Sequence, residues 1–213
     1  LLLPEVSRLV TRIVQTSIHL AETVRDVTDA FVCDSSDGTT WTRFDLRSEI
    51  RGAAELVRGS VRNGVELAIL DHGPCEIVGN PHGIRRLCVN ILSNALRATV
   101  KGTVKVGVEI DKTNPSWVVL RVSDSGDGIP AEVLPMLGEP LALSSGARRR
   151  HYSVNGAGLG LAICRRVAAR HGGRIRIETK TGEGTEVSVR FRTDLPESSG
   201  EFDFAPLDTV LRP

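Results

Sequence analysis

The chain has 213 residues, of which 40% are hydrophobic and 25% are charged, so it can bury one core of ordinary size and carry a small extension. Its 27 basic and 26 acidic side chains nearly balance, which argues against the broad positive field of a nucleic-acid-binding or membrane-surface protein. No apolar run approaches the roughly 20 residues that span a bilayer, so any membrane anchor is expected outside this chain. Four cysteines without CxxC spacing indicate reduced thiols and favour a cytoplasmic location: Cys33, Cys75, Cys88 and Cys164.

The first 33 residues predict one long amphipathic helix. Between residues 5 and 31, apolar side chains recur at a spacing of three and four, with polar residues between them. Such an apolar stripe must be covered. It packs either against another copy of the chain or against a second long helix outside this chain, or the helix folds back on the globular domain. Residues 34–43 are rich in Asp, Ser, Gly and Thr and are predicted to form a linker.

A globular domain is predicted over residues 44–192. Its first elements are a helix from residue 46 to about 62, a strand at 65–70 and a shorter strand at 76–78. Asn80 and Pro81 supply a helix cap and a first-turn proline, and the helix that they open is expected to end near Thr99.

Alternating apolar residues, mostly valines, then predict an antiparallel hairpin over residues 104–110 and 118–122. A further helix at 158–171 ends at two glycines, and a closing hairpin follows over 175–177 and 187–191. The helices are long enough to cover one face only, so we expect an α+β fold, a two-layer α/β sandwich with a mixed, mostly antiparallel sheet. Residues 193–213 have prolines and an acidic excess and are predicted to be a flexible tail.

Polar side chains line one face of the helix that begins at Pro81. Asn90, Asn94 and Arg97 stand at i, i+4 and i+7, opposite the apolar residues. An asparagine oxygen suits Mg²⁺, which accepts one or two protein ligands when phosphates and waters complete its octahedron. The plain alternative is a solvated polar face.

Two glycine-rich segments follow. Asp124 ends a strand and precedes Gly126 and Gly128, so its carboxylate can accept a hydrogen bond from a base amine while the backbone lies against the ring; a simple turn is the alternative. Residues 156–161 (GAGLGL) open a helix, where backbone N–H groups and the helix dipole favour an anion.

Taken together, the three segments resemble the histidine kinase branch of the family shared by DNA gyrase, heat-shock chaperones, histidine kinases and mismatch-repair ATPases. Residues 88–97 resemble its N box, 124–128 its G1 box and 156–161 its G2 box, and the turn at 182–185 completes the set. The resemblance covers about residues 5–191. It identifies residues 1–33 as the second helix of a dimerisation hairpin, and residues 44–192 as an ATP-binding catalytic domain of the Bergerat fold.

The resemblance also implies roles for individual residues. Asp124 would bind the adenine amine, Asn94 would hold Mg²⁺, and Asn90 and Arg97 would act in catalysis by contacting the phosphates. The glycines of the two boxes would frame the nucleotide. The residues implied to bind ATP and Mg²⁺ are Asn90, Asn94, Arg97, Asp124, Gly126, Gly128, Gly156, Gly158, Leu159 and Gly160.

The region before the second glycine-rich segment departs from the family pattern. Residues 137–155 match the family's mobile ATP lid, and its basic run at 148–151 is either a neutraliser of the γ-phosphate or an incidental solvated charge. Residues 134–141 (LPMLGEPL) stand where relatives have a phenylalanine-rich motif, and leucines can fill the same apolar volume. Asn80 stands where many relatives have aspartate.

Position 90 separates the branches of the family. Hydrolysing members have a glutamate four residues before the metal-binding asparagine, whereas this chain has Asn90, which cannot act as a general base. The γ-phosphate is therefore expected to pass to a histidine. No histidine of the chain is followed by an acidic residue, as the family's acceptor is, and His19 precedes Leu20. We therefore expect this chain alone to bind ATP without phosphorylating itself.

The implied protein is a two-component sensor histidine kinase that works as a homodimer and passes phosphate to the aspartate of a response regulator. Two other functions stay open. One is a degenerate phosphotransfer or scaffold module that has kept the fold and lost the nucleotide. The other is a serine kinase that regulates a sigma factor, although this would have no need of the N-terminal helix.

Overall fold

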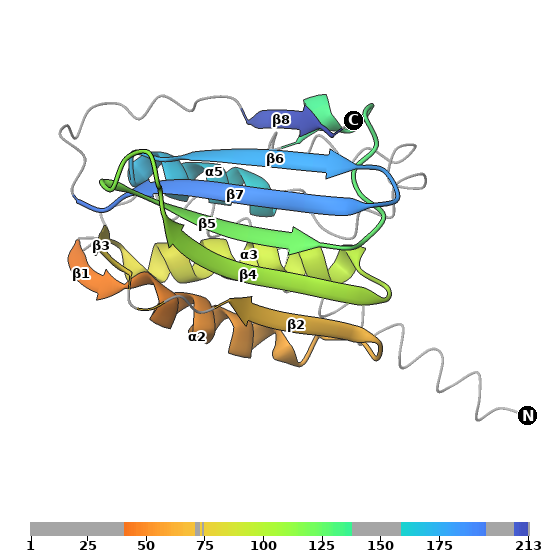
Figure 1. Ribbon diagram of the computed structural model, residues 1–213, viewed down its shortest axis with the longest axis horizontal. Helices are drawn as coiled ribbons and strands as arrows, with labels where there is room; N and C mark the ends of the chain where they lie inside the picture. Colours follow the sequence, from red (N-terminus) through yellow and green to blue (C-terminus); the bar gives the residue numbers. More distant parts are fainter. Residues whose placement is uncertain (1–40, 71–72, 74, 138–158, 195–206, 213) are drawn as a thin grey trace, which may run out of the picture.

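A computed structural model describes residues 41–70, 73, 75–137, 159–194 and 207–212. The described residues form two layers, with a six-stranded sheet on one side and three helices packed on one of its faces (Figure 1). The predicted α/β sandwich is confirmed. Its elements are β1 (Thr42–Asp45), α2 (Leu46–Arg58), β2 (Val65–Leu70), β3 (Glu76–Gly79), α3 (Pro81–Ala98), β4 (Gly102–Ile110), β5 (Trp117–Asp124), the 3₁₀ helix η1 (Leu134–Met136), α5 (Leu159–Arg170), β6 (Arg174–Lys180), β7 (Gly184–Arg192) and β8 (Asp208–Leu211).

The large sheet has the order β2-β4-β5-β7-β6-β8. Its four central strands pair antiparallel, whereas β2 and β8 pair parallel to their neighbours at the two edges. A separate two-stranded sheet joins β1 to β3. Alternating side chains give the sheet one apolar face. Val106, Val122 and Val187 lie side by side on β4, β5 and β7, and all three pack into the core between the sheet and the helices.

The helices close the core from one side. Asn80 caps α3 by accepting the N–H of Gly83 at 3.1 Å, and Pro81 occupies the first helical position. The apolar stripe of α3 is almost wholly buried against the sheet and against its neighbouring helices. The buried side chains of α3 are Ile84, Leu87, Cys88, Ile91, Leu92, Ala95 and Leu96. None of the helices in the described residues is both long and apolar enough to span a membrane.

Three details differ from the sequence-based expectations. The helix α2 ends at Arg58 and not near residue 62, because Gly59 and a turn follow it. Strand β1 begins at Thr42, inside the stretch predicted as a linker. The tail was expected to be flexible throughout, and this was wrong for Asp208–Leu211, which pairs with the open edge of β6. The long helix predicted over residues 1–33 lies outside the described residues.

A buried histidine ties α5 to the start of α3. His171 is 3% exposed, its Nε2 accepts the N–H of Asn80 at 3.1 Å, and its Nδ1 lies 2.8 Å from the carbonyl of Val167. The rings of Trp41 and Phe191 pack beside it. Since Nε2 accepts a hydrogen bond, the imidazole is neutral with its proton on Nδ1.

Stability is therefore expected to fall as the pH drops below 6.5, the ordinary pKa of histidine. Burial lowers the pKa of His171, so the unfolded chain takes up a proton that the folded chain resists. Urea unfolding at several pH values between 7.5 and 5 checks this. His171→Gln should be less stable at neutral pH but should depend less on pH, and an equal pH dependence of the two proteins would contradict this account.

Candidate functional site

One face of α3 carries the polar residues that the sequence singled out. Because the apolar stripe of this helix turns into the core, Asn90, Asn94 and Arg97 lie on the opposite side. Asn90 is partly buried, whereas the other two side chains are exposed. The guanidinium of Arg97 donates a hydrogen bond from Nη2 to Oδ1 of Asn94. The predicted metal ligand and the predicted phosphate ligand are therefore in direct contact.

The first turn of α5 meets the same polar face. The side-chain amide of Asn90 donates to the backbone carbonyl of Gly160, with 3.5 Å between Nδ2 and O. A Cβ at position 160 would lie 3.6 Å from the Asn90 side chain, which is an ordinary van der Waals contact. The two residues are therefore neighbours, but this contact would also accommodate a larger residue than glycine. The N-terminal end of a helix carries a partial positive charge, and here it lies against the side chain of Asn90.

A carboxylate stands at the end of β5. Oδ1 of Asp124 accepts the N–H of Gly126 at 2.9 Å and the N–H of Thr185 at 3.3 Å. Burial raises the pKa of Asp124, and the two N–H groups partly offset that effect. Within the part of the chain that the structure describes, Oδ2 receives no hydrogen bond. In Asp124, therefore, Oδ1 is bound by two backbone N–H groups, and Oδ2 can accept a hydrogen bond from a ligand.

Two glycines pack the loop after Asp124 against its neighbours. A Cβ at Gly126 would lie 2.4 Å from the carbonyl oxygen of Ala98, the last residue of α3. Gly128 has a positive φ of 69°, and a Cβ there would lie 2.2 Å from the carbonyl oxygen of Lys180. Only glycine permits this backbone conformation without strain together with so close an approach. The loop is therefore fixed between the end of α3 and the end of β6.

The structure describes most but not all of the residues of the predicted site. Asn90, Asn94, Arg97, Asp124, Gly126, Gly128 and Gly160 are described. Gly156, Gly158 and the lid residues 138–155 lie outside the described residues, as does His19, and Leu159 is described only as the start of α5. Before the lid, Leu134 is buried and Leu137 packs on the core, so leucines do fill apolar volume there.

Sequence reasoning missed two residues of this site. Thr179 and Thr185 are buried and connect the Asp124 loop to the β6–β7 hairpin. The turn that contains Thr185 was recognised as part of a motif, but no hydrogen-bonding role followed from it. A buried threonine in a strand has no distinctive pattern in a single sequence, because its β-branched side chain is also an ordinary strand residue.

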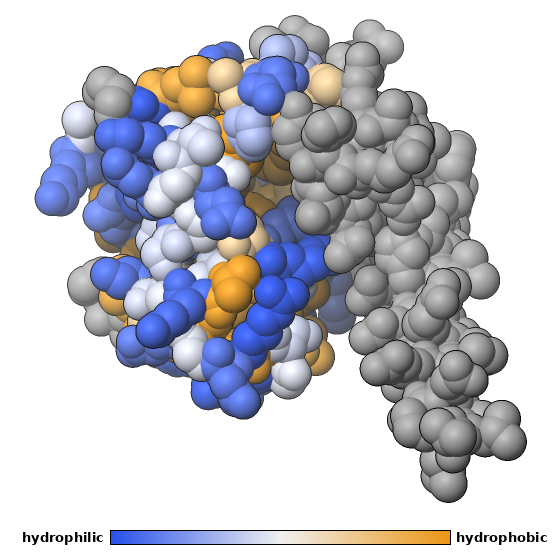
Figure 2. Space-filling model, turned by 90° about the vertical axis from the view of Figure 1, so that its right-hand side faces the viewer, coloured by the Kyte–Doolittle hydropathy of each residue, from blue (hydrophilic) through white to orange (hydrophobic). Residues whose placement is uncertain are grey.

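The described surface at the end of the molecule where β5 and β6 finish is mainly polar (Figure 2). Figure 2 looks at this end, where hydrophilic residues cover most of the described surface and hydrophobic residues form small separate groups.

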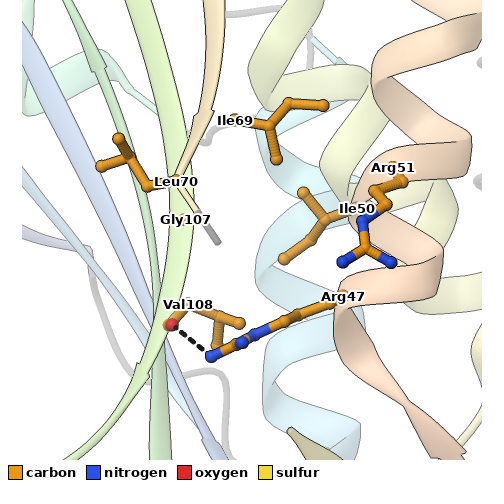
Figure 3. Close-up of a pocket in the computed structure, with 7 residues that line it drawn as sticks. All are labelled: Arg47, Ile50, Arg51, Ile69, Leu70, Gly107 and Val108. Atoms are coloured by element: carbon orange, nitrogen blue, oxygen red, sulfur yellow. Dashed lines mark hydrogen bonds between the residues drawn. The ribbon is translucent and has the colours of Figure 1, made fainter. Parts of the chain in front are cut away.

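A small cavity of about 10 Å³ lies elsewhere, between α2 and the strands β2 and β4 (Figure 3). Beside it, the Arg47 guanidinium donates to the carbonyl of Val108 at 3.3 Å. This cavity has room for about one water molecule and contains none of the predicted site residues.

An α/β sandwich with a carboxylate at a strand end, a polar face on one helix and Gly160 in the first turn of the next defines a nucleotide-binding domain of the ATPase class. A scan against family models agrees, since residues 79–195 match the family described as histidine kinase-, DNA gyrase B-, and HSP90-like ATPase. This chain belongs to that family.

Curated relatives include histidine kinases. The chain is 33% identical over 182 residues to the histidine protein kinase DivJ of Caulobacter vibrioides, which covers 81% of this chain and 28% of that protein. It is 32% identical over 178 residues to the signal transduction histidine-protein kinase/phosphatase MprB of a Mycobacterium species, covering 84% of this chain and 33% of that protein. The chain therefore spans a third or less of the length of these two relatives.

Solved structures support the fold. The mycobacterial sensor histidine kinase MprB superposes with a TM-score of 0.58 at 26% identity, covering 74% of this chain and all of that chain. Full-length ShkA in complex with AMPPNP superposes with a TM-score of 0.67 at 21% identity, covering 97% of this chain and 48% of that one.

Proposed function

We propose that this chain is the ATP-binding catalytic portion of a two-component sensor histidine kinase. The observation that carries the proposal is that α3 contacts both other parts of the site. Its Asn90 donates to Gly160 in the first turn of α5, and its last residue, Ala98, packs against Gly126, whose N–H binds the Asp124 carboxylate. The names of the curated relatives support the same activity. Bound Mg-ATP would supply the γ-phosphoryl group, which passes to a histidine on a dimerisation helix outside these 213 residues and then to a response-regulator aspartate.

The base would be recognised by Asp124. Its Oδ1 is already held by two backbone N–H groups, so Oδ2 is the oxygen that accepts the adenine amine. The backbone at Gly126 and Gly128 lies where a side chain does not fit, which keeps the loop in place beside the ring.

The phosphates and Mg²⁺ would be held by the polar face of α3 and the start of α5. Oδ1 of Asn94 would be the protein ligand of Mg²⁺, which would offset the negative charge of the phosphates, and Arg97, which donates to that oxygen in this structure, would pair with a phosphate. Asn90 lies against Gly160 and orients the phosphate side of the site. Gly156, Gly158, Leu159 and Gly160 would frame the triphosphate with backbone N–H groups.

Transfer is favoured over hydrolysis because no general base stands at position 90. An amide cannot take a proton from water, so Asn90 positions groups without activating a nucleophile. The working protein would be a cytoplasmic homodimer, or the cytoplasmic part of a membrane-anchored kinase, with a receiver domain as its partner.

A chimera tests the transfer. A helical dimerisation hairpin of the kind that the family resemblance implies, with an acceptor histidine followed by an acidic residue, replaces residues 1–33, and the protein is incubated with Mg²⁺ and ATP labelled at the γ-phosphate. We expect an acid-labile, alkali-stable label that disappears when the acceptor histidine is changed to alanine. Free phosphate as the main product would contradict the proposal, and an acid-stable label on a hydroxyl would favour the serine kinase instead.

A further inference from the structure

We propose that Thr179 is a positioning residue for the adenine pocket: its buried hydroxyl fixes both the loop after Asp124 and the peptide group that holds the Asp124 carboxylate. This inference rests on the proposed function, since it concerns how the same pocket is built. Thr179 lies in β6, is fully buried and belongs to neither the polar helix face nor the glycine-rich segments. It therefore acts through its neighbours and not by touching the nucleotide.

The hydroxyl of Thr179 uses its whole hydrogen-bonding capacity. It accepts the N–H of Ile129 at 2.8 Å, donates to the carbonyl of Gly184 at 3.1 Å, and lies 3.1 Å from the hydroxyl of Thr185. A hydroxyl has one proton and two lone pairs, so a donation to Gly184 leaves two acceptor sites, for Ile129 and Thr185. Because this hydroxyl is buried, removing it leaves an amide N–H and a carbonyl without these partners.

One of these bonds leads directly to Asp124. The carbonyl of Gly184 and the N–H of Thr185 belong to the same peptide group, and that N–H donates to Oδ1 of Asp124 at 3.3 Å. Thr179 thus orients the peptide from its carbonyl side, while Asp124 accepts from its N–H side. Hydrogen bonds in such a chain strengthen one another.

The other bond fixes the far end of the loop. Ile129 follows Gly128, whose backbone already lies against the carbonyl of Lys180, the residue after Thr179. The backbone of Thr179 is itself held from the opposite side, since its carbonyl accepts the N–H of Arg212 at 2.9 Å next to β8. The hydroxyl therefore connects a well-anchored strand to both ends of the loop that carries Asp124.

Thr179→Val tests this, because valine keeps the shape and removes the hydroxyl. Calorimetric titrations use Mg²⁺ with ATP and with purine riboside triphosphate, which lacks the 6-amino group. We expect Thr179→Val to lower the affinity for ATP about tenfold and to leave that for purine riboside triphosphate within about threefold. Thr179→Ser, which keeps the hydroxyl, should bind both like the wild type.

Other outcomes decide between the inference and the function on which it rests. Equal losses for both nucleotides, or no loss for ATP, would overturn the positioning role and leave ATP binding intact. A wild-type chain that binds neither nucleotide would overturn the proposed function as well. If the valine variant does not fold, Thr179→Cys, whose thiol hydrogen-bonds weakly, should show the same selective loss of ATP affinity, and an unselective loss there would also overturn the role.

Discussion

Asp124→Asn is expected to lower the affinity of the chain for ATP about a hundredfold without unfolding it. A carboxylate has two acceptor oxygens, and here Oδ1 accepts the N–H groups of Gly126 and Thr185 while Oδ2 is left for the adenine amine. Asparagine has the same shape but only one oxygen. Its NH₂ group must face either the two backbone N–H groups or the amine, and all of these are donors.

The neighbouring carboxylate offers a matched control. Asp127 lies in the same loop, but its side chain is exposed, so Asp127→Asn should bind ATP like the wild type. Calorimetric titration of both variants, with circular dichroism to confirm that they are folded, makes the comparison. Equal affinities of the two variants for ATP would show that Asp124 does not recognise the base.

Gly184→Ala should lower the free energy of unfolding by about 3 kcal/mol or more and abolish nucleotide binding. Gly184 has a φ of +101°, and a Cβ there would lie 2.0 Å from the carbonyl oxygen of Asp124. That oxygen belongs to the backbone, so either β5 or β7 must move. Such a shift disturbs the hydrogen bond between Thr185 and Asp124 as well as the fold.

Gly182, in the same turn, separates steric overlap from backbone strain. It also has a positive φ, of 81°, but a Cβ there would meet nothing within 4 Å. Gly182→Ala should therefore cost about 1 kcal/mol, the strain of the left-handed conformation alone, and should still bind ATP. Urea unfolding of the two variants measures the difference, and equal losses of stability would refute the packing argument.

The central elements of the fold could be predicted because their patterns are local. Alternating apolar residues, mostly valines, mark β4 and β5, and the cap at Asn80 with the three-and-four spacing after it marks α3. The short strands β1 and β8 could not be predicted in this way. Each has four residues, and each is ordered by a partner far away in the chain, β3 for β1 and β6 for β8.

The residues of the candidate site also fall into those that local sequence patterns reveal and those that only long-range pairing reveals. Asn90, Asn94 and Arg97 were found because helical spacing alone brings them to one face, and Asp124 because glycines follow it at a strand end. Thr179 and Thr185 were missed as site residues because their contacts depend on the pairing of β5 with β7, which brings Asp124 next to Thr185 across 61 positions of the chain. Only the folded sheet makes that contact visible.

Titration of ATP into the wild-type chain, with and without Mg²⁺, tests the central claim most directly. The account predicts saturable binding of one nucleotide per chain, with an affinity for ATP that rises when Mg²⁺ is present because Asn94 and the phosphates then share the ion. An absence of binding under both conditions would contradict it, and would favour a scaffold module that has kept the fold of the family without its nucleotide.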